Sequence, residues 1–491
     1  MLDRLDHALR TDRPERPAVL AATRAGAVRV RARRGELAEL ADGYAAALHR
    51  RGLRAGDTVG VAVRPGPRAL AVLLALWRLG LRGAVLDPGA GAEVLRARLT
   101  LARPSLVLAD ATAQAASGWA GPLARRAGIA LPDLGALGPV ATVGPRLPGC
   151  GPALETTGRV AYRYDGDGDA VIVFTSGTTS RPRAVVHSRA SLTAGMDTVA
   201  ALFRARPGEP VLGGTFFVLV PSLGQGAPVA LPARRPRVLA RQLCRLRPAG
   251  TYLTPPQLRD ALRAGARFPV HGRVWTGSAP ASAELLTRVR RAGAAEAWGV
   301  YALTELFPAA AVESREKAAY EGDGDLVGAP LPGVEATTDA DGQLLLSGPA
   351  ARHRYLGEDP DPWVRTGDRA RLDGTGRMVL QGRCKDMVLR RAENIYPGLY
   401  EPALHVPGVD LAVLVGVPAD DGDERLVAVV QPRPGADEGA LRSALAAPLR
   451  RMGSARPDAL LFATVPLAGR SRKPDRAAAA RLATARLGNL G

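Results

Sequence analysis

The stretch AVIVFTSGTTSRPR at residues 170–183 decides the predicted fold. Its first five residues are apolar and predict a buried strand, after which the chain enters a turn rich in glycine and hydroxyl side chains. Ligands bind at the carboxyl edge of α/β sheets, where backbone amides and hydroxyl groups can hold phosphate oxygens. The turn lacks the lysine and hydroxyl ending of a GxxxxGK[ST] loop, so taken alone it indicates no more than an ordinary loop.

Short apolar runs alternate with helical patterns on both sides of this stretch, which is typical of a parallel α/β sheet. A Gly- and Pro-rich segment without periodicity at residues 135–158 predicts a long connector. Strands are expected at residues 59–63, 83–86, 106–108, 343–346 and 378–381, and helices at residues 68–79 and 93–102.

The pattern changes after Gly382, where a helix near Tyr400, strands at residues 411–417 and 426–430 and a helix from Glu438 are expected. The predicted fold class is therefore α/β, with a large N-terminal domain of mostly parallel sheets and helices over residues 1–382. A small α+β domain is expected over residues 386–491, and its size of about a hundred residues is typical of a domain.

Composition excludes several classes of protein. The net charge is +19, but the arginines are scattered among acids without a nucleic-acid motif, so no nucleic-acid partner is expected. Electrostatic attraction of ATP, CoA or an acidic carrier protein is a simpler role for the positive charge. No apolar run reaches the ~20 residues of a membrane span and the start lacks a signal sequence, so a cytoplasmic protein is expected. Three widely spaced cysteines predict neither disulfides nor a zinc site.

Five further motifs follow the turn in a fixed order. They are WTGSAP at 275–280, YALTE at 301–305, TGD at 366–368, GRCKD at 382–386 continuing to ENIYP at 393–397 and Glu401, and KPDR at 473–476. Together with the turn they resemble the motifs of the adenylate-forming superfamily, which contains acyl-CoA synthetases, adenylation domains and luciferases. The resemblance spans nearly the whole chain.

The resemblance implies that ATP and Mg²⁺ are used to join a carboxylate to AMP with release of pyrophosphate. Arg183 stands where the family usually has a lysine. Thr304 would contact the α-phosphate, and Glu305 would hold Mg²⁺, a hard cation that binds carboxylate and phosphate oxygens. The residues expected to hold the β- and γ-phosphates are Thr175, Ser176, Gly177, Thr178 and Thr179.

The remaining motifs imply an adenosine site. Asp368 would accept both ribose hydroxyls, with Arg383 donating beside it. Taken singly, an aspartate after glycine is commonly a turn former, but the order of the motifs favours the functional interpretation. The other residues implied in nucleotide binding are Gly277, Ser278, Ala279 and Tyr301.

Only three of the 66 basic residues are lysines, namely Lys317, Lys385 and Lys473. A GC-rich genome explains why lysine is scarce. That the three remaining lysines stand at these positions by chance is an alternative. The resemblance implies that Lys473 bridges the substrate carboxylate and the α-phosphate, a task that suits a compact point charge. Lys385 would be the hinge about which a mobile small domain rotates between two half-reactions.

Several positions depart from the family pattern. Ser180, Ala184 and Ala302 replace usual glycines, and each added side chain crowds the backbone. Arg391 and Ala392 stand where many CoA ligases have two glycines. Transfer to a thiol is therefore less strongly predicted than adenylation.

Residues 216–220, FFVLV, carry no acid where domains that activate amino acids place an aspartate, so an apolar acid is favoured. DPGAG at 87–91 and PSLG at 221–224 look similar to segments of olefin-pathway β-lactone synthetases, although both could be plain turns. The ENIYP segment instead looks similar to CoA ligases.

The sequence thus predicts an acid-thiol ligase that activates a fatty or β-hydroxy fatty acid and transfers it to CoA. The alternatives are closure of a β-lactone, transfer to an acyl carrier protein, and a non-catalytic nucleotide-binding homologue.

Overall fold

The structure is a computed structural model that describes residues 1–87, 92–122, 138–175, 183–390, 393–419, 424–469 and 472–487. Ser176, Gly177, Thr178, Thr179, Ser180, Arg391, Ala392 and residues 88–91 lie outside the described residues. Two compact units are present. The first comprises Met1–Tyr252, Thr304–Pro308 and Gly348–Val364, and the second comprises Leu253–Leu303, Ala309–Ser347 and Arg365–Gly491.

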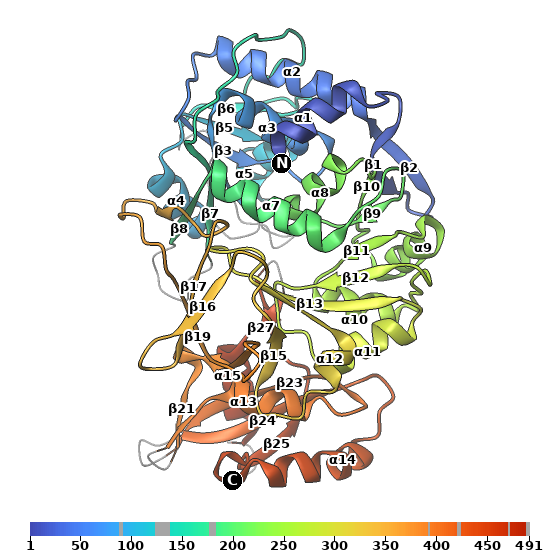
Figure 1. Cartoon of the computed structure of the whole chain (residues 1–491), viewed down its shortest axis with the longest axis vertical. Helices are drawn as coiled ribbons and strands as arrows, with labels where there is room; N and C mark the ends of the chain where they lie inside the picture. Colours follow the sequence, from blue (N-terminus) through green and yellow to red (C-terminus); the bar gives the residue numbers. More distant parts are fainter. Residues whose placement is uncertain are drawn as a thin grey trace. The chain divides into compact units, whose positions relative to one another are not determined.

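The first unit is built on a seven-stranded sheet of order β18-β8-β7-β4-β3-β5-β6 (Figure 1). Neighbours from β7 to β6 pair in parallel, whereas β8 is antiparallel to both β7 and β18. The strands are β3 (Thr58–Ala62), β4 (Arg82–Val85), β5 (Leu106–Ala109), β6 (Val140–Thr142), β7 (Asp169–Phe174), β8 (Ala184–Ser188) and β18 (Arg354–Tyr355).

A second set of strands in this unit has the order β2-β1-β10-β9-β11, in which only β1 and β2 pair antiparallel. They are β1 (Pro17–Ala22), β2 (Val28–Arg33), β9 (Val211–Leu212), β10 (Val229–Leu231) and β11 (Gly250–Tyr252). The helices are α1 (Leu2–Thr11), α2 (Arg34–Arg50), α3 (Pro67–Leu79), α4 (Ala92–Ala102), α5 (Ala111–Ser117), α7 (Arg189–Phe203), α8 (Phe216–Gly224) and α9 (Pro236–Leu246).

Helices α1, α2 and α3 pack against one another in the first unit (Figure 1). Their buried leucines and alanines form much of its core. Arg78 of α3 is buried among them and pairs with Asp6 of α1 at 2.7 Å and with Asp42 of α2. A buried cation needs such partners, because an uncompensated charge inside the protein is strongly destabilising. This ion cluster therefore fixes how the three helices pack.

The second unit contains β12, β13 and β14, of which β12 and β13 are parallel, and a five-stranded sheet of order β15-β20-β19-β17-β16. The strands are β12 (Arg273–Thr276), β13 (Glu296–Tyr301), β14 (Ala310–Glu313), β15 (Asp325–Gly328), β16 (Glu335–Thr338), β17 (Gln343–Ser347), β19 (Val364–Leu372) and β20 (Met378–Arg383). The helices are α10 (Pro255–Arg263), α11 (Ala283–Arg291) and α12 (Ser314–Ala318).

The C-terminal part of this unit is the expected small α+β assembly. Figure 1 shows its sheet β23-β24-β25 together with the helices α14 and α15. The sheet residues form two separate apolar clusters, one with side chains of α14 and the other with side chains of α15. The elements are η3 (Cys384–Asp386), β21 (Val388–Arg390), β22 (Glu393–Ile395), α13 (Pro397–Tyr400), η4 (Glu401–Leu404), β23 (Val409–Pro418), β24 (Glu424–Pro432), α14 (Glu438–Arg451), η5 (Gly453–Ala455), β25 (Ala459–Phe462), β26 (Leu467–Ala468), β27 (Lys473–Pro474) and α15 (Arg476–Leu487).

These elements confirm the predicted mixed α/β fold with parallel sheets and a small C-terminal α+β part. The expected boundary at residues 382–386 falls inside the second unit, and both that boundary and the hinge at Lys385 stay predictions. Among the described residues, no helix is long and apolar enough to cross a bilayer.

Two segments differ from the expected turns and connectors. The connector at 135–158 contains the short strand β6, because Val140–Thr142 pair in parallel with β5. Thr142 also donates its backbone N–H to the Pro152 carbonyl and accepts from Leu154. The PSLG segment is the last turn of α8, with Pro221 buried inside the helix, so it is not a plain turn.

Candidate active site

The turn at residues 175–183 begins where β7 ends. The backbone N–H of Thr175 donates to the carbonyl of Arg183 at 3.0 Å, which closes the base of the turn between β7 and β8. Thr175 is half-buried and Arg183 is exposed at the start of β8. The antiparallel pairing of these two strands therefore brings Thr175 and Arg183 together at the carboxyl end of β7.

Arg183, Glu305 and Tyr355 form one cluster in the first unit. The guanidinium carbon of Arg183 lies over the Tyr355 ring at 4.6 Å from its centroid, and the Tyr355 hydroxyl donates to Oε1 of Glu305 at 3.1 Å. Burial, and then the nearby Glu305 carboxylate, raise the pKa of Tyr355, which keeps the phenol protonated as a donor. The structure thus brings together the predicted phosphate-binding arginine and the predicted metal ligand.

Thr304 is held by a histidine that sequence reasoning did not single out. Nε2 of the buried His187 lies 2.7 Å from the Thr304 carbonyl, and Nδ1 lies 3.3 Å from the Ser191 hydroxyl. Burial lowers the pKa of His187 to about 4, so the ring is neutral and Nε2 carries the proton that the carbonyl requires. A polar residue in the apolar run AVVHS of β8 was the signal for this role.

Two phenylalanine rings pack beside His187 in the first unit. Phe307 packs with its ring centroid 3.9 Å from that of Phe217 in α8, and it meets the His187 ring edge-on at 5.4 Å. α8 carries no charged side chain in any of its nine residues. Phe307 is a member of the buried core of the first unit, and Phe217 packs against that core.

Asp368 is the centre of a second group, which lies in the second unit. It is 5% exposed in β19 and accepts from the Tyr301 hydroxyl at 2.6 Å through Oδ2 and from Arg383 Nε at 2.8 Å through Oδ1. Arg383 is the residue directly opposite Asp368 in the β19–β20 pairing. Burial, followed by the charge of Asp368, raises the pKa of Tyr301, which therefore remains a hydrogen-bond donor.

The expected adenine-side loop leaves β12 in the same unit. Gly277 is buried, whereas Ser278 is exposed and has a positive φ of 69°, a conformation that is uncommon for residues other than glycine. Ala279 follows half-buried. Strained backbone of this kind is frequent at ligand sites, which is compatible with the predicted role.

The two lysines with predicted roles are both exposed in the second unit. Lys385 lies in η3, and Lys473 lies in β27, whose hairpin with β26 pairs it with Ala468. The next motif residue, Arg476, donates through Nη2 to Glu401 at 2.7 Å and pairs through Nε with Asp386 at 3.0 Å. Arg476 thus links the segments that contain both lysines, a task that sequence reasoning did not assign.

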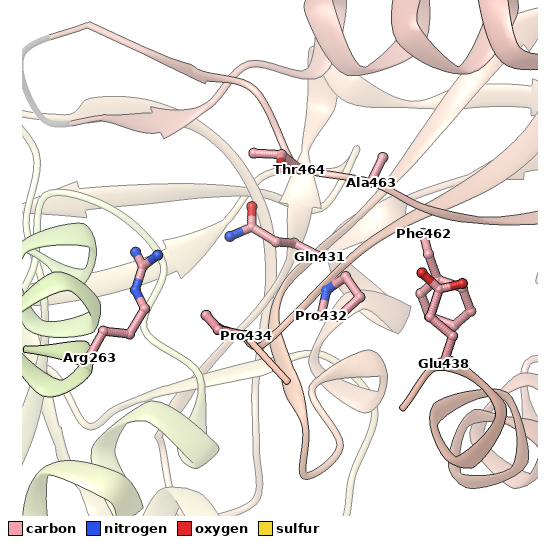
Figure 2. A pocket seen from close by; sticks show the side chains of 8 residues that line it. All are labelled: Arg263, Gln431, Pro432, Pro434, Glu438, Phe462, Ala463 and Thr464. Carbon is pink, nitrogen blue, oxygen red and sulfur yellow. The ribbon is translucent and has the colours of Figure 1, made fainter. Parts of the chain in front are cut away.

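A pocket of about 370 Å³ lies in the second unit, and no predicted site residue lines it (Figure 2). Arg263 of α10 faces side chains from β24, β25 and the start of α14 across it. The lining residues are Arg263, Gln431, Pro432, Pro434, Glu438, Phe462, Ala463 and Thr464.

Comparisons with known proteins found relatives that are similar to this chain in sequence. Olefin beta-lactone synthetase of Stenotrophomonas maltophilia (strain K279a) is 27% identical over 474 residues, which cover 83% of this chain and 82% of that protein. Feruloyl-CoA synthase of an Amycolatopsis species is 28% identical over 303 residues, covering 55% of this chain and 60% of that protein.

The fold is shared with the amide bond synthetase McbA from Marinactinospora thermotolerans. The TM-score is 0.78 at 23% sequence identity, and the match covers 98% of this chain and 99% of that one. The pattern of the family described as AMP-binding enzyme matches residues 8–355, well over half of the sequence, and the chain therefore belongs to the AMP-binding enzyme family.

Proposed function

We propose that this enzyme uses ATP to activate an apolar carboxylic acid as an acyl adenylate, with release of pyrophosphate, and then transfers the acyl group to CoA. The observation that carries the proposal is the buried Asp368 carboxylate, which Tyr301 and Arg383 hold from two sides. Each carboxylate oxygen has a lone pair left, so Asp368 can still accept two ribose hydroxyls.

The phosphates of ATP are assigned to the first group of residues. Arg183 would offset the charge of the β- and γ-phosphates, the amides and hydroxyls of the 175–179 turn would donate hydrogen bonds to them, and Thr304 would hold the α-phosphate. His187 supports this role because it fixes the backbone of Thr304.

The residues fit a Mg²⁺ ion that is bound mainly by substrate. Among the described residues, no cluster of three or more His, Cys, Asp or Glu side chains could hold a metal ion, and Glu305 is a single carboxylate. One carboxylate with phosphates and water is the usual ligand set of Mg²⁺ in nucleotide sites. When bound, Mg²⁺ would supply positive charge beside the phosphate oxygens.

Lys473 would neutralise charge at the reacting centre. The substrate carboxylate and the α-phosphate that it attacks are both anions and repel each other. A lysine ammonium that contacts both groups lowers this repulsion. The absence of an acidic side chain from residues 216–220 of α8 favours a fatty or β-hydroxy fatty acid as the substrate.

β-Lactone synthesis is the second candidate. The similarity to an olefin beta-lactone synthetase extends over 83% of this chain, whereas the similarity to the feruloyl-CoA synthase covers 55%. In this alternative the β-hydroxyl of the substrate displaces AMP, so no external acceptor is needed. Transfer to an acyl carrier protein and a non-catalytic nucleotide-binding role remain further alternatives.

One experiment separates most of these functions. The enzyme is incubated with a panel of fatty and β-hydroxy acids, ATP and Mg²⁺, with and without CoA, and the products are identified by mass spectrometry. We expect acyl adenylate without CoA and acyl-CoA with it. A β-lactone formed without CoA would favour the second candidate, and ATP binding without any product would favour a non-catalytic role.

A further inference from the structure

Arg183 lies where the phosphate turn returns to the sheet, one residue before β8. Its guanidinium carbon lies 4.6 Å from the centroid of the Tyr355 ring. The guanidinium carbon of Arg352 also lies 4.6 Å from the centroid of that ring. One aromatic ring therefore serves two arginines, one exposed and one buried.

The sheet register explains why these side chains meet. Tyr355 lies opposite Val185 in the antiparallel β8–β18 pairing, and Arg183 is two residues before Val185. Residues two apart in a strand share a face, and diagonal neighbours across a strand pair lie within reach of long and aromatic side chains. The stacking of Arg183 on Tyr355 thus follows from the register of the edge strand.

The same tyrosine also holds Glu305. Its hydroxyl donates to Oε1 of Glu305 at 3.1 Å, and the neighbouring Arg352 donates its backbone N–H to the Glu305 carbonyl at 2.6 Å. Arg352 is itself anchored, since its guanidinium donates to the Asp361 carbonyl at 2.9 Å. Both the backbone and the side chain of Glu305 are therefore fixed from the segment that carries Tyr355.

We propose that Tyr355 is a positioning residue that orients two groups at once: the Arg183 cation for the phosphates of ATP, and the Glu305 carboxylate for Mg²⁺. This inference rests on the proposed function. A planar guanidinium stacks on an aromatic face and then points in a defined direction, whereas a lysine ammonium is a flexible point charge. The ring thus explains how arginine can stand at 183 in place of the usual lysine.

Tyr355→Phe tests the link to Glu305, because it keeps the ring and removes only the hydroxyl. ATP binding is measured by calorimetry in EDTA and then during a Mg²⁺ titration. We expect ATP affinity in EDTA to stay within about twofold, and the half-saturating Mg²⁺ concentration to rise about tenfold, as for loss of a hydrogen bond to a charged group. An unchanged or lower Mg²⁺ requirement would overturn the positioning role.

A double-mutant cycle of Arg183→Lys and Tyr355→Leu tests the stacking. The KM for ATP is measured in pyrophosphate release for the parent, both single variants and the double variant. If the ring orients Arg183, Arg183→Lys should raise KM about two- to fivefold more in the parent than in the Tyr355→Leu background. Equal effects in both backgrounds would contradict the proposal.

Tyr355→Met provides a second background without the ring in case Tyr355→Leu does not fold. If the ring orients Arg183, Arg183→Lys should again raise the KM for ATP less there than in the parent. An equal rise in KM in that background would show that stacking on the ring is not what orients Arg183.

Tyr320→Phe is the matched control. The Tyr320 hydroxyl also donates to an oxygen, the Asp323 carbonyl at 3.1 Å, but it belongs to the second unit and to no predicted site. Its Mg²⁺ dependence should equal that of the parent. If the parent binds no ATP, the proposed function fails and this inference fails with it. If ATP binding is intact and Tyr355→Phe leaves the Mg²⁺ dependence unchanged, this inference fails alone.

Discussion

At the scale of single residues, Asp368 makes the most direct prediction. Asp368→Ala removes the acceptor proposed for the ribose hydroxyls and should weaken ATP binding by about 1.5–3 kcal/mol, or about 10- to 150-fold in Kd. Isothermal calorimetry measures the change. Asp373→Ala is the control, since Asp373 accepts from Thr375 and Arg377 in the turn between β19 and β20 and should leave Kd unaltered. Unchanged ATP affinity in Asp368→Ala would reduce Asp368 to a structural residue.

Lys473 should act on the reaction more than on binding. Lys473→Ala should lower the rate of adenylate formation about 10²- to 10³-fold, the usual effect of removing one group that stabilises charge in the transition state. ATP affinity should stay close to that of the parent, because the charge that Lys473 meets develops during the reaction. Pyrophosphate release and calorimetry together provide both measurements.

Lys473→Arg separates charge from shape. A guanidinium keeps the charge but is larger and planar, so this variant should fail almost as badly as Lys473→Ala. A fully active arginine variant would show that the lysine survived by chance in an arginine-rich chain.

The sequence indicated the proposed site residues through family motifs, but not the residues that hold them. His187, Tyr355 and Arg476 act through partners 117, 50 and 75 positions away in the chain. Such partners are set by strand pairing and packing, which no local pattern records. The polar residue in the apolar β8 was visible in the sequence, but its partner Thr304 was not.

At the scale of elements, regular patterns gave good predictions. β3, α3 and β4 begin and end within one residue of the expected positions, because each combines a clear apolar period with glycine or proline at its ends. α8 was not expected, since its buried apolar run has no helical period and contains Pro221. β18 has only two residues and forms because β8 offers it a free edge, which is a tertiary effect.

His187 in β8 leads to a prediction about how stability depends on pH. His187 has a pKa of about 4 when folded, below the ordinary value of 6.5, because burial disfavours the charged ring. Between about pH 6.5 and 4 the unfolded chain binds a proton that the folded protein does not, so stability falls as the pH falls through this window. The shift corresponds to about 3 kcal/mol.

His187→Gln keeps a donor for the Thr304 carbonyl and removes the titration. Urea denaturation at pH 7.5 and at pH 4 should show that the parent loses about 3 kcal/mol more than the variant over this range. Carboxylates titrate in both proteins, so the difference isolates His187. Equal losses would mean that His187 is protonated in the folded protein.

At the scale of the whole molecule, the predicted hinge at Lys385 decides whether the two half-reactions need different arrangements of the small C-terminal part. Lys385 lies in the 3₁₀ turn η3. The φ range usual for 3₁₀ turns is compatible with proline. Lys385→Pro should therefore fix the backbone there, while Lys385→Ala removes the charge and leaves the dihedrals free. A thermal melt shows whether both variants fold.

If the small domain rotates about Lys385, Lys385→Pro should slow one half-reaction by about tenfold or more and spare the other, whereas Lys385→Ala should spare both. Adenylate formation and acyl-CoA formation are measured separately in single-turnover experiments. Equal rates for the proline and alanine variants in both steps would rule out a hinge at this position. If the parent enzyme converts β-hydroxy acids to lactones without CoA, no external thiol has to enter the site. The second step would then be intramolecular ring closure in place of transfer to CoA.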